Sequence, residues 1–538
     1  MSVTATPPVA EPDQPDQAAA GGDEPSGSPE PRPGAHPAAW RWAALFVLPY
    51  LLIGLAWVFS NPPGAAPDEP DHLVKAIGMG QLDIGDEAPD PRPSDPPLEA
   101  RNESISRIVD IPARLAPDGY TCFAFNADAT AACLPTETPS SSRSVERVTP
   151  IGAYPPYMYI PMGLAARAMT TPYHAFLAAR LVALLSAAAA LFAGAWILVR
   201  ELGRAALLGA FVAITPMAVY AASSVTTSGL EIASGFAVGA IVVVCLRKPE
   251  ALLAPRTHLL LAGVGSVLVL SRQMGVVTLA VLLAVLAAVA WRQVWQLIRE
   301  HRLSFLASVG MLAVSGLAVA WWERRYDHPV NTGSPVSPHA LDSFWALARG
   351  VVDSAIGVFG WLDTPLPEWA LWAWLGTAAL VVGMGLLLGA RRERWALAAV
   401  LLATVAVTYG SYAAIFYPVG ASSQGRHVLP LLAFCPVLAG VVIVERLREV
   451  NLGDALRRLF LAVAVVAGAL QLLSLYYNAR RYAVGLSGPM VFLGEAEWSP
   501  RLGWLPWLVV GAAGAVLLAV VAYASHPEPD PELTPGDP

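Results

Sequence analysis

Charge is scarce in this sequence. Of its 538 residues, 14% are charged, whereas roughly a quarter are charged in ordinary soluble domains, and 55% are hydrophobic. This composition excludes a soluble globular protein. The formal net charge is −7, from 34 basic and 41 acidic side chains, but much of the acid lies in two proline-rich tails, so this number says little about partners. We do not expect a nucleic-acid-binding protein.

Cysteine is equally scarce, with four residues in the whole chain. Cys245 and Cys435 lie inside apolar runs, so the four cysteines do not show the spacing of a metal cluster. Cys122 and Cys133 share a polar segment. These two either form a disulfide, if the segment lies outside the cytoplasm, or remain two unpaired thiols.

The two ends of the chain are rich in proline and acidic residues and show no apolar periodicity. We therefore expect residues 1–39 and 526–538 to be disordered tails. The first apolar run starts too far along the chain for a simple cleavable signal peptide. Residues 40–60 are better interpreted as a retained anchor and first transmembrane helix.

Long apolar segments then recur through the range 176–525. They are 176–199, 205–222, 228–246, 257–270, 275–291, 303–322, 368–390, 395–416, 428–444, 459–476 and 503–524. Most reach the length of about 20 residues that a helix needs to cross the bilayer, although 257–270 is short. The sequence therefore predicts an all-α polytopic membrane protein with about 11–12 transmembrane helices.

Basic residues predict which connections face the cytoplasm. Five short connections carry them: 200–204, 247–256, 292–302, 391–394 and 445–458. Two of these flank 257–291, so the chain must cross the membrane an even number of times between them, and Ser271 to Gly275 must form an outward hairpin tip. Both termini are then cytoplasmic. The long polar loops are extracytoplasmic: 61–175, 323–367, 417–427 and 477–502. Within them, we expect interfacial helices at 154–175 and 341–361.

An acidic motif follows the first predicted span. It reads Pro67-Asp68-Glu69-Pro70-Asp71-His72, with Lys75 one turn later. A proline in the first turn predicts a helix start, which places Asp68, Asp71, His72 and Lys75 on one helix face with Glu69 beside them. Such a face could hold a divalent cation or a reacting hydroxyl. The alternative is that Asp68 caps the helix while the other acids favour its positive end.

Arginines lie on three other outer segments. Arg272, Arg426 and Arg480 could bind a phosphate through their planar forks of donors, or each could extend toward lipid headgroups. Trp361 and Asp363 lie between glycines and prolines before the eighth span. They could stack on and hydrogen-bond a sugar ring, or belong to an interfacial aromatic belt.

These motifs together resemble a bacterial family of polytopic membrane proteins known as domain of unknown function 2142, itself similar to the GT-C superfamily of membrane glycosyltransferases. The resemblance runs from about residue 45 to about residue 505. It is carried by Pro67 to His72, Tyr154-Pro155-Pro156-Tyr157, Thr215-Pro216, Ser271-Arg272-Gln273, the segment 357–367, Gln424-Gly425-Arg426-His427 with Pro430, and Asn478 to Tyr482.

GT-C membership implies an enzyme that takes a sugar from a polyprenyl-phosphate carrier and transfers it to an acceptor outside the cytoplasmic membrane, using an acid in the first outer loop. Asp68 and Glu69 match that position. The family often carries an acid just before the Gly-Leu of the fourth span, where this chain has Ser228, so the nearby Glu231 is assigned no role. His427 replaces the tyrosine of the more common Gly-Arg-Tyr.

The resulting hypothesis is a transferase in which Asp68 or Glu69 accepts the acceptor's proton while arginines hold the departing phosphate. A divalent cation, Mg²⁺ or Mn²⁺, could assist through Asp71 and His72. The residues expected to bind substrate or phosphate are His72, Arg272, Gln273, Arg426, Arg480, Trp361, Asp363 and Tyr154.

The implied partners are the bilayer, the lipid-linked sugar donor and an envelope glycan, glycolipid or protein acceptor. Two other functions stay open. One is a lipid-linked saccharide flippase or exporter that binds phosphate with the same arginines. The other is a non-catalytic membrane protein of envelope assembly. The concentration of span charges near the outer ends, at Arg180, Glu231 and Arg272, favours a site at the outer surface over a transport path through the midplane.

Overall fold

The computed structural model describes most of the chain. The described residues are 2, 38–92, 95–136, 141, 143–326 and 342–527. The predicted disordered tails therefore lie largely outside the described residues, as does 327–341 within the predicted loop 323–367.

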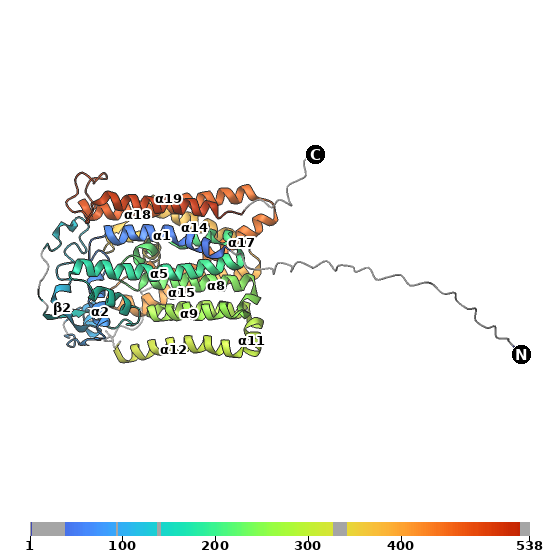
Figure 1. Cartoon of the computed structure of the whole chain (residues 1–538), viewed down its shortest axis with the longest axis horizontal. Helices are drawn as coiled ribbons and strands as arrows, with labels where there is room; N and C mark the ends of the chain where they lie inside the picture. The colour runs from blue at the N-terminus through green and yellow to red at the C-terminus, as the bar shows by residue number, and fades with distance from the viewer. Residues whose placement is uncertain are drawn as a thin grey trace, which may run out of the picture. The chain divides into compact units, whose positions relative to one another are not determined.

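Long helices packed side by side make up most of the described chain (Figure 1). Each of the twelve apolar segments forms one helix or adjoining helices. The longest are α1 (Ala39–Ser60), α5 (Pro172–Leu202), α8 (Ser228–Arg247), α9 (Pro255–Ser271), α10 (Gln273–Val289), α12 (Arg302–Tyr326), α14 (Glu368–Leu388), α15 (Arg391–Ser411), α17 (Phe434–Glu449), α18 (Gly453–Val484) and α19 (Trp504–Ala524). This confirms the predicted all-α polytopic membrane architecture.

The number of spans depends on how bent helices are counted. Among the described residues, nine helices are long and apolar enough to cross a membrane, or eleven if each of two bent pairs is one span. One pair joins 204–213, which ends in α6 (Leu208–Ala213), to α7 (Pro216–Ala222) at 82°; the other joins α10 to α11 (Trp291–Glu300) at 92°. Thr215 explains the first bend, because its hydroxyl caps α7 at Ala218 N, 3.2 Å away.

The helices run between two ends of the bundle, one with α2 and β2 and the other with α11 (Figure 1). Ion pairs join the connections predicted to be cytoplasmic. Arg247 pairs with Glu393 and Glu445, and Arg256 lies 3.6 Å from Glu201. Four of the five basic connections thus meet, which is the arrangement that the charge pattern predicts.

The first outer segment folds into a small unit at the opposite end. It contains α2 (Glu69–Gly80), β1 (Asp86–Glu87), α3 (Pro97–Ser104), β2 (Arg107–Pro112), β3 (Ser144–Thr149) and α4 (Tyr159–Arg167). The three strands form an antiparallel sheet in the order β1-β2-β3. The sequence analysis did not predict this sheet. Cys122 and Cys133 are joined by a disulfide, so the first of the two alternatives for these cysteines is the one observed.

Shorter elements complete the end of the bundle that carries α2 and β2. They are α13 (Phe344–Gly357), the hairpin of β4 (Val358–Phe359) and β5 (Thr364–Pro365), and the turn Gly425–His427 before α16 (Leu429–Leu432). The expected interfacial helices correspond to α4 and α13. The predicted loop 477–502 begins later than expected, because α18 continues to Val484 and takes Arg480 into its last turns.

Candidate active site

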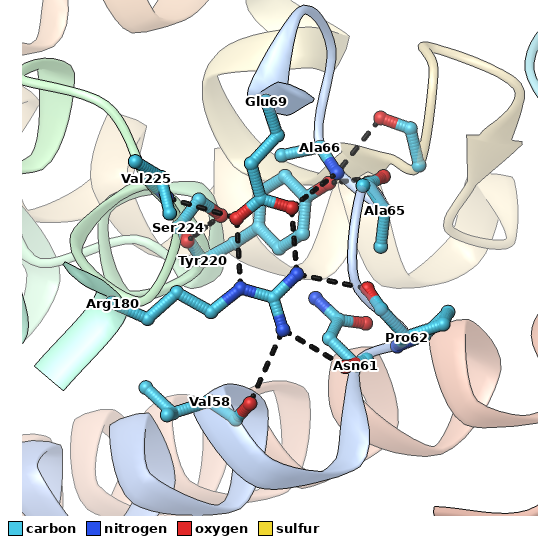
Figure 2. Close-up of polar contacts among 12 residues, drawn as sticks. Val58, Asn61, Pro62, Ala65, Ala66, Glu69, Arg180, Tyr220, Ser224 and Val225 are labelled. Carbon is cyan, nitrogen blue, oxygen red and sulfur yellow. Dashed lines mark hydrogen bonds and ion pairs between the residues drawn. The ribbon is translucent and has the colours of Figure 1, made fainter. Parts of the chain in front are cut away.

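A buried ion pair fixes the turn between α1 and α2 (Figure 2). Glu69 and Arg180 form it, with side chains 0% and 1% exposed. Arg180 Nε and Nη2 donate to the two carboxylate oxygens at 2.7 and 2.6 Å, and the Val225 N–H donates to the same carboxylate at 2.9 Å. Arg180 also donates to the carbonyl groups of Val58, Asn61 and Pro62. The pair therefore joins α1, α2, α5 and the turn before α8.

The neighbouring acid, Asp68, has a different environment. It occupies the N-cap position of α2, but its side chain makes no capping hydrogen bond, so the capping role considered for it is wrong. Its backbone is left-handed, with a φ of 57°, which non-glycine residues seldom adopt. The charges of Arg426 and Arg272 act on its carboxylate, and both favour the ionised form. Burial outweighs them and raises the pKa of Asp68 above its ordinary value.

Arg272 lies at the single-residue break between α9 and α10, at the end of the bundle that carries α2. Its guanidinium donates to Ser228 Oγ at 2.5 Å and to Tyr154 Oη at 3.2 Å, and it stacks over the Tyr154 ring at 5.0 Å. The break is tight: a Cβ on Gly275 would lie 2.1 Å from the Leu268 carbonyl oxygen. This confirms the predicted hairpin tip and shows why glycine follows it.

Arg426, from the C-terminal half of the chain, is the second arginine whose charge acts on Asp68. It sits in the turn between α15 and α16, which α13 holds: the Gly425 N–H donates to Ser354 Oγ at 2.8 Å. The Nε of Arg426 and the Oε1 of Gln424 are buried without a hydrogen-bond partner among the described residues. Both side chains line a small pocket, which is also lined by Pro67, Met217, Tyr220, Ser354, Val358, Gly360 and Leu362.

The charged groups of this site do not form ion pairs with one another. Within the described part of the chain, no ion pair within 4.0 Å involves Arg272 or Arg426, and no hydrogen bond reaches the carboxylate of Asp68. Asp68, Arg272 and Arg426 are half-buried, and charged groups that are withdrawn from water are normally paired. Two arginines without a carboxylate partner, near an acid, are therefore suited to an anionic ligand that carries a reacting group.

The face of α2 beside Asp68 carries further ionisable groups. Burial and the Asp68 charge raise the pKa of Asp71 to about 7. His72 Nδ1 lies 2.7 Å from Tyr159 Oη, and burial with nearby cations holds the pKa of His72 well below its usual range. Lys75 donates to the Gly152 carbonyl at 2.6 Å, and burial lowers its pKa to about 7.

This face does not assemble a metal site by itself. Over the described ranges, no group of three or more His, Cys, Asp or Glu side chains could hold a metal ion. Asp71 and His72 therefore lack a third protein ligand of these kinds, and the divalent cation considered from the sequence has no built site here.

Comparison with known proteins identifies the family. A family model described as "Predicted membrane protein (DUF2142)" matches residues 51–435. The chain belongs to the DUF2142 family. No curated protein is similar enough to match it. The crystal structure of ArnT from Cupriavidus metallidurans in the apo state is similar at 15% sequence identity, covering 91% of this chain and 77% of that one with a TM-score of 0.43.

In this DUF2142 chain, two residues expected to bind sugar are occupied by protein contacts. Trp361 is buried and donates through Nε1 to the Gly64 carbonyl at 2.9 Å. Asp363 pairs with Arg481 at 2.9 Å, and Arg481 also binds carbonyl groups of the disulfide loop, including that of Phe123 at 2.9 Å. Both residues hold the outer segments together around the turn that precedes Asp68.

Arg480 also lies apart from Arg272 and Arg426. Its guanidinium binds carbonyl groups of the segment that follows α18, those of Leu486, Gly488 and Pro489. Gln273 begins α10 directly after Arg272, and the described residues include no hydrogen-bond partner for its side chain. Of the predicted binding residues, Tyr154, Arg272 and Arg426 are therefore the ones that the fold gathers around Asp68, with His72 behind them on α2.

Two residues near the site had no role assigned from the sequence. Tyr159 lies against His72, and its position in the tyrosine-rich segment after residue 154 was the available signal. Glu231, 1% exposed in α8, has both carboxylate oxygens buried without a partner in the described part of the chain. A lone acid inside a predicted span was the signal for Glu231.

Proposed function

We propose that this protein is a membrane glycosyltransferase that moves a sugar from a polyprenyl-phosphate carrier to an envelope glycan, glycolipid or protein acceptor at the extracytoplasmic surface. The observation that carries the proposal is the placement of the Asp68 carboxylate beside two guanidinium groups, Arg272 and Arg426, that lack carboxylate partners within the described residues. Transfer of a sugar from a lipid phosphate needs a base for the acceptor's proton and cationic groups that stabilise the departing phosphate.

The proposed step is a single displacement at the anomeric carbon. The acceptor hydroxyl oxygen attacks this carbon, and the bond from the carbon to the carrier phosphate oxygen breaks. Asp68 takes the hydroxyl proton, as the base does in an inverting glycosidase. The electron pair leaves with the polyprenyl phosphate, whose developing charge Arg272 and Arg426 stabilise. Tyr154 orients Arg272 by bonding and stacking.

Asp68 is a better candidate for the base than Glu69. A base needs a free oxygen near the reacting proton and a pKa close to the working pH. Burial raises the pKa of Asp68, and no described group donates to its carboxylate. Both oxygens of Glu69 already accept from Arg180 and its surroundings. Glu69 is therefore assigned to positioning the turn that carries Asp68.

The proposed sidedness rests on two features at opposite ends of the bundle. The disulfide Cys122–Cys133 belongs to the end with Asp68, and stable disulfides are typical of compartments outside the cytoplasm. The basic connections meet at the other end, which the positive-inside rule assigns to the cytoplasm. The site would then face the periplasm or cell exterior.

Asp68→Asn tests the proposal in a strain whose chromosomal copy of the gene is deleted and replaced by a plasmid copy. We expect normal membrane levels of the variant, loss of transfer by about 10²–10⁴-fold, and accumulation of the lipid-linked sugar, all measured by mass spectrometry of glycans and lipids. Asp86→Asn, an exposed acid of the same outer segment, is the matched control and should retain wild-type glycans.

Purified protein separates transfer from transport. In detergent, without a second compartment, wild-type protein should convert lipid-linked sugar from the deletion strain to polyprenyl phosphate when envelope acceptor is supplied, and Asp68→Asn should not. Wild-type glycans in cells that carry a correctly inserted Asp68→Asn variant would contradict the assignment of the base.

A further inference from the structure

Glu231 is an unpaired acid deep in the outer half of the bundle. It lies one turn into α8, is 1% exposed, and has no hydrogen-bond partner on either carboxylate oxygen among the described residues. A buried carboxylate left without a partner is strongly unfavourable, so such groups are rare unless a charge or a ligand compensates them.

The compensating charges are the two arginines of the proposed active site. The guanidinium groups of Arg272 and Arg426 both act on the Glu231 carboxylate, and that carboxylate in turn acts on Arg272. Arg272 also donates to Ser228 Oγ at 2.5 Å, on the same helix and three residues before Glu231. Residues three apart on a helix lie on one side of it, so Arg272 contacts α8 within one turn of Glu231.

Two acidic side chains accompany the two arginines when no ligand is bound. Two guanidinium groups, which repel each other, have Asp68 and Glu231 as the carboxylates that act on them. Neither carboxylate comes within ion-pairing distance of Arg272 or Arg426 in the described residues, so the donors that Arg272 does not give to Ser228 and Tyr154, and those of Arg426, are available to a phosphate.

We propose that Glu231 is the counter-ion of the Arg272–Arg426 pair and limits how tightly this pair holds the departing polyprenyl phosphate. This inference rests on the proposed function. Glu231 acts through the arginines and is a positioning residue rather than a catalytic one. Its charge would weaken the complex with the product more than the complex with the donor.

The lipid phosphate carries more negative charge after the transfer step than before it, which explains why Glu231 would weaken product binding more than donor binding. The donor is a phosphodiester with one negative charge, whereas the released polyprenyl phosphate is a monoester that carries nearly two near neutral pH. Asp68 becomes neutral as it takes the acceptor's proton. The charge of Glu231 then still opposes the dianion at the two arginines, which favours release of the product and exchange for a new donor.

The test measures equilibrium binding of undecaprenyl phosphate to the purified full-length protein in detergent. Glu231→Gln removes the charge and keeps the shape, so we expect the dissociation constant to fall by about tenfold or more, since a unit charge at close range in a protein interior contributes on that scale. Glu231→Asp keeps the charge and should bind like the wild type. Ser234→Ala, three residues further along α8, is an uncharged control and should also bind like the wild type.

A gain of affinity is informative because misfolding does not produce it. Unchanged or weaker binding by Glu231→Gln that unfolds at the wild-type temperature would overturn the inference alone. Arg426→Gln tests the phosphate site itself and should weaken binding at least tenfold. If the wild type binds no better than Arg426→Gln, the proposed phosphate site fails, and the role of Glu231 fails with it.

Discussion

Substitution of Glu69, which forms an ion pair with Arg180, distinguishes a residue needed for stability from one needed for catalysis. Glu69→Gln removes the negative charge but keeps the side-chain volume. The new amide nitrogen would face a guanidinium group that needs acceptors, and Arg180, 1% exposed, would keep its charge without a counter-ion. Removing one partner of a buried ion pair costs about 3–5 kcal/mol. The two Arg180 hydrogen bonds at 2.7 and 2.6 Å are charge-assisted, at about 1.5–3 kcal/mol each, which agrees with that range.

The assay is thermal unfolding of the purified protein, followed by the fluorescence of its 17 tryptophans. Glu69→Gln should lower Tm and reduce the amount of protein in the membrane. Asp68→Asn should leave Tm within about a degree of the wild type and abolish transfer. Arg180→Gln combined with Glu69→Gln should recover part of the stability, because no unpaired charge remains. A Glu69→Gln variant with wild-type Tm and no transfer activity would refute the division of roles between the two acids.

Two other predictions concern the first outer segment. Burial and the charge of Asp68 raise the pKa of Asp71 from 3.8 to about 7, so its contribution to stability is fully present below about pH 4 and is lost as the pH rises through about 7. Asp71→Asn should remove this loss, and the Tm of the variant minus that of the wild type should increase by about 2–4 °C between pH 5 and pH 8; parallel Tm curves would contradict it. Cys122→Ser opens a loop whose ends are 11 residues apart and should lower stability by about 3 kcal/mol. Reduced wild-type protein should then unfold like the untreated variant, and a variant as stable as the oxidised wild type would be evidence against a stabilising bridge.

Most of the fold follows from the sequence because the membrane imposes simple rules. Apolar segments of about 20 residues became helices, and the basic connections on either side of 257–291 required the hairpin at Arg272 that the structure contains. The β1–β3 sheet was not predicted, because its strands are short and separated in sequence by more than 30 residues between Pro112 and Ser144. The extension of α18 through Arg480 was also missed, because polar residues at the end of an apolar run resemble a loop.

The site was only partly predictable, because a sequence shows which charges exist but not which ones are paired. Asp68 and Glu69 are adjacent and chemically alike, yet one faces two arginines and the other is enclosed by Arg180 and main-chain donors. Asp363 looked equally available and is paired with Arg481. The partners come from helices more than a hundred residues away, and no local pattern reports them.

The end of the bundle that carries α2 therefore uses its charged side chains in two ways. Glu69–Arg180 and Asp363–Arg481 are closed pairs, in which each arginine also binds several main-chain carbonyl groups. Arg180 binds those of the loop that precedes α2, and Arg481 binds those of the disulfide loop. Arg426 has no such partners in the described chain, and its buried Nε is left without a hydrogen bond, which is unfavourable. The two closed pairs show that this fold can supply a carboxylate partner to a buried arginine, but Arg426 has none. The missing partner of Arg426 is the physical reason to expect an anionic ligand at this site. The nearby carboxylate of Asp68 is the reason to expect proton transfer there.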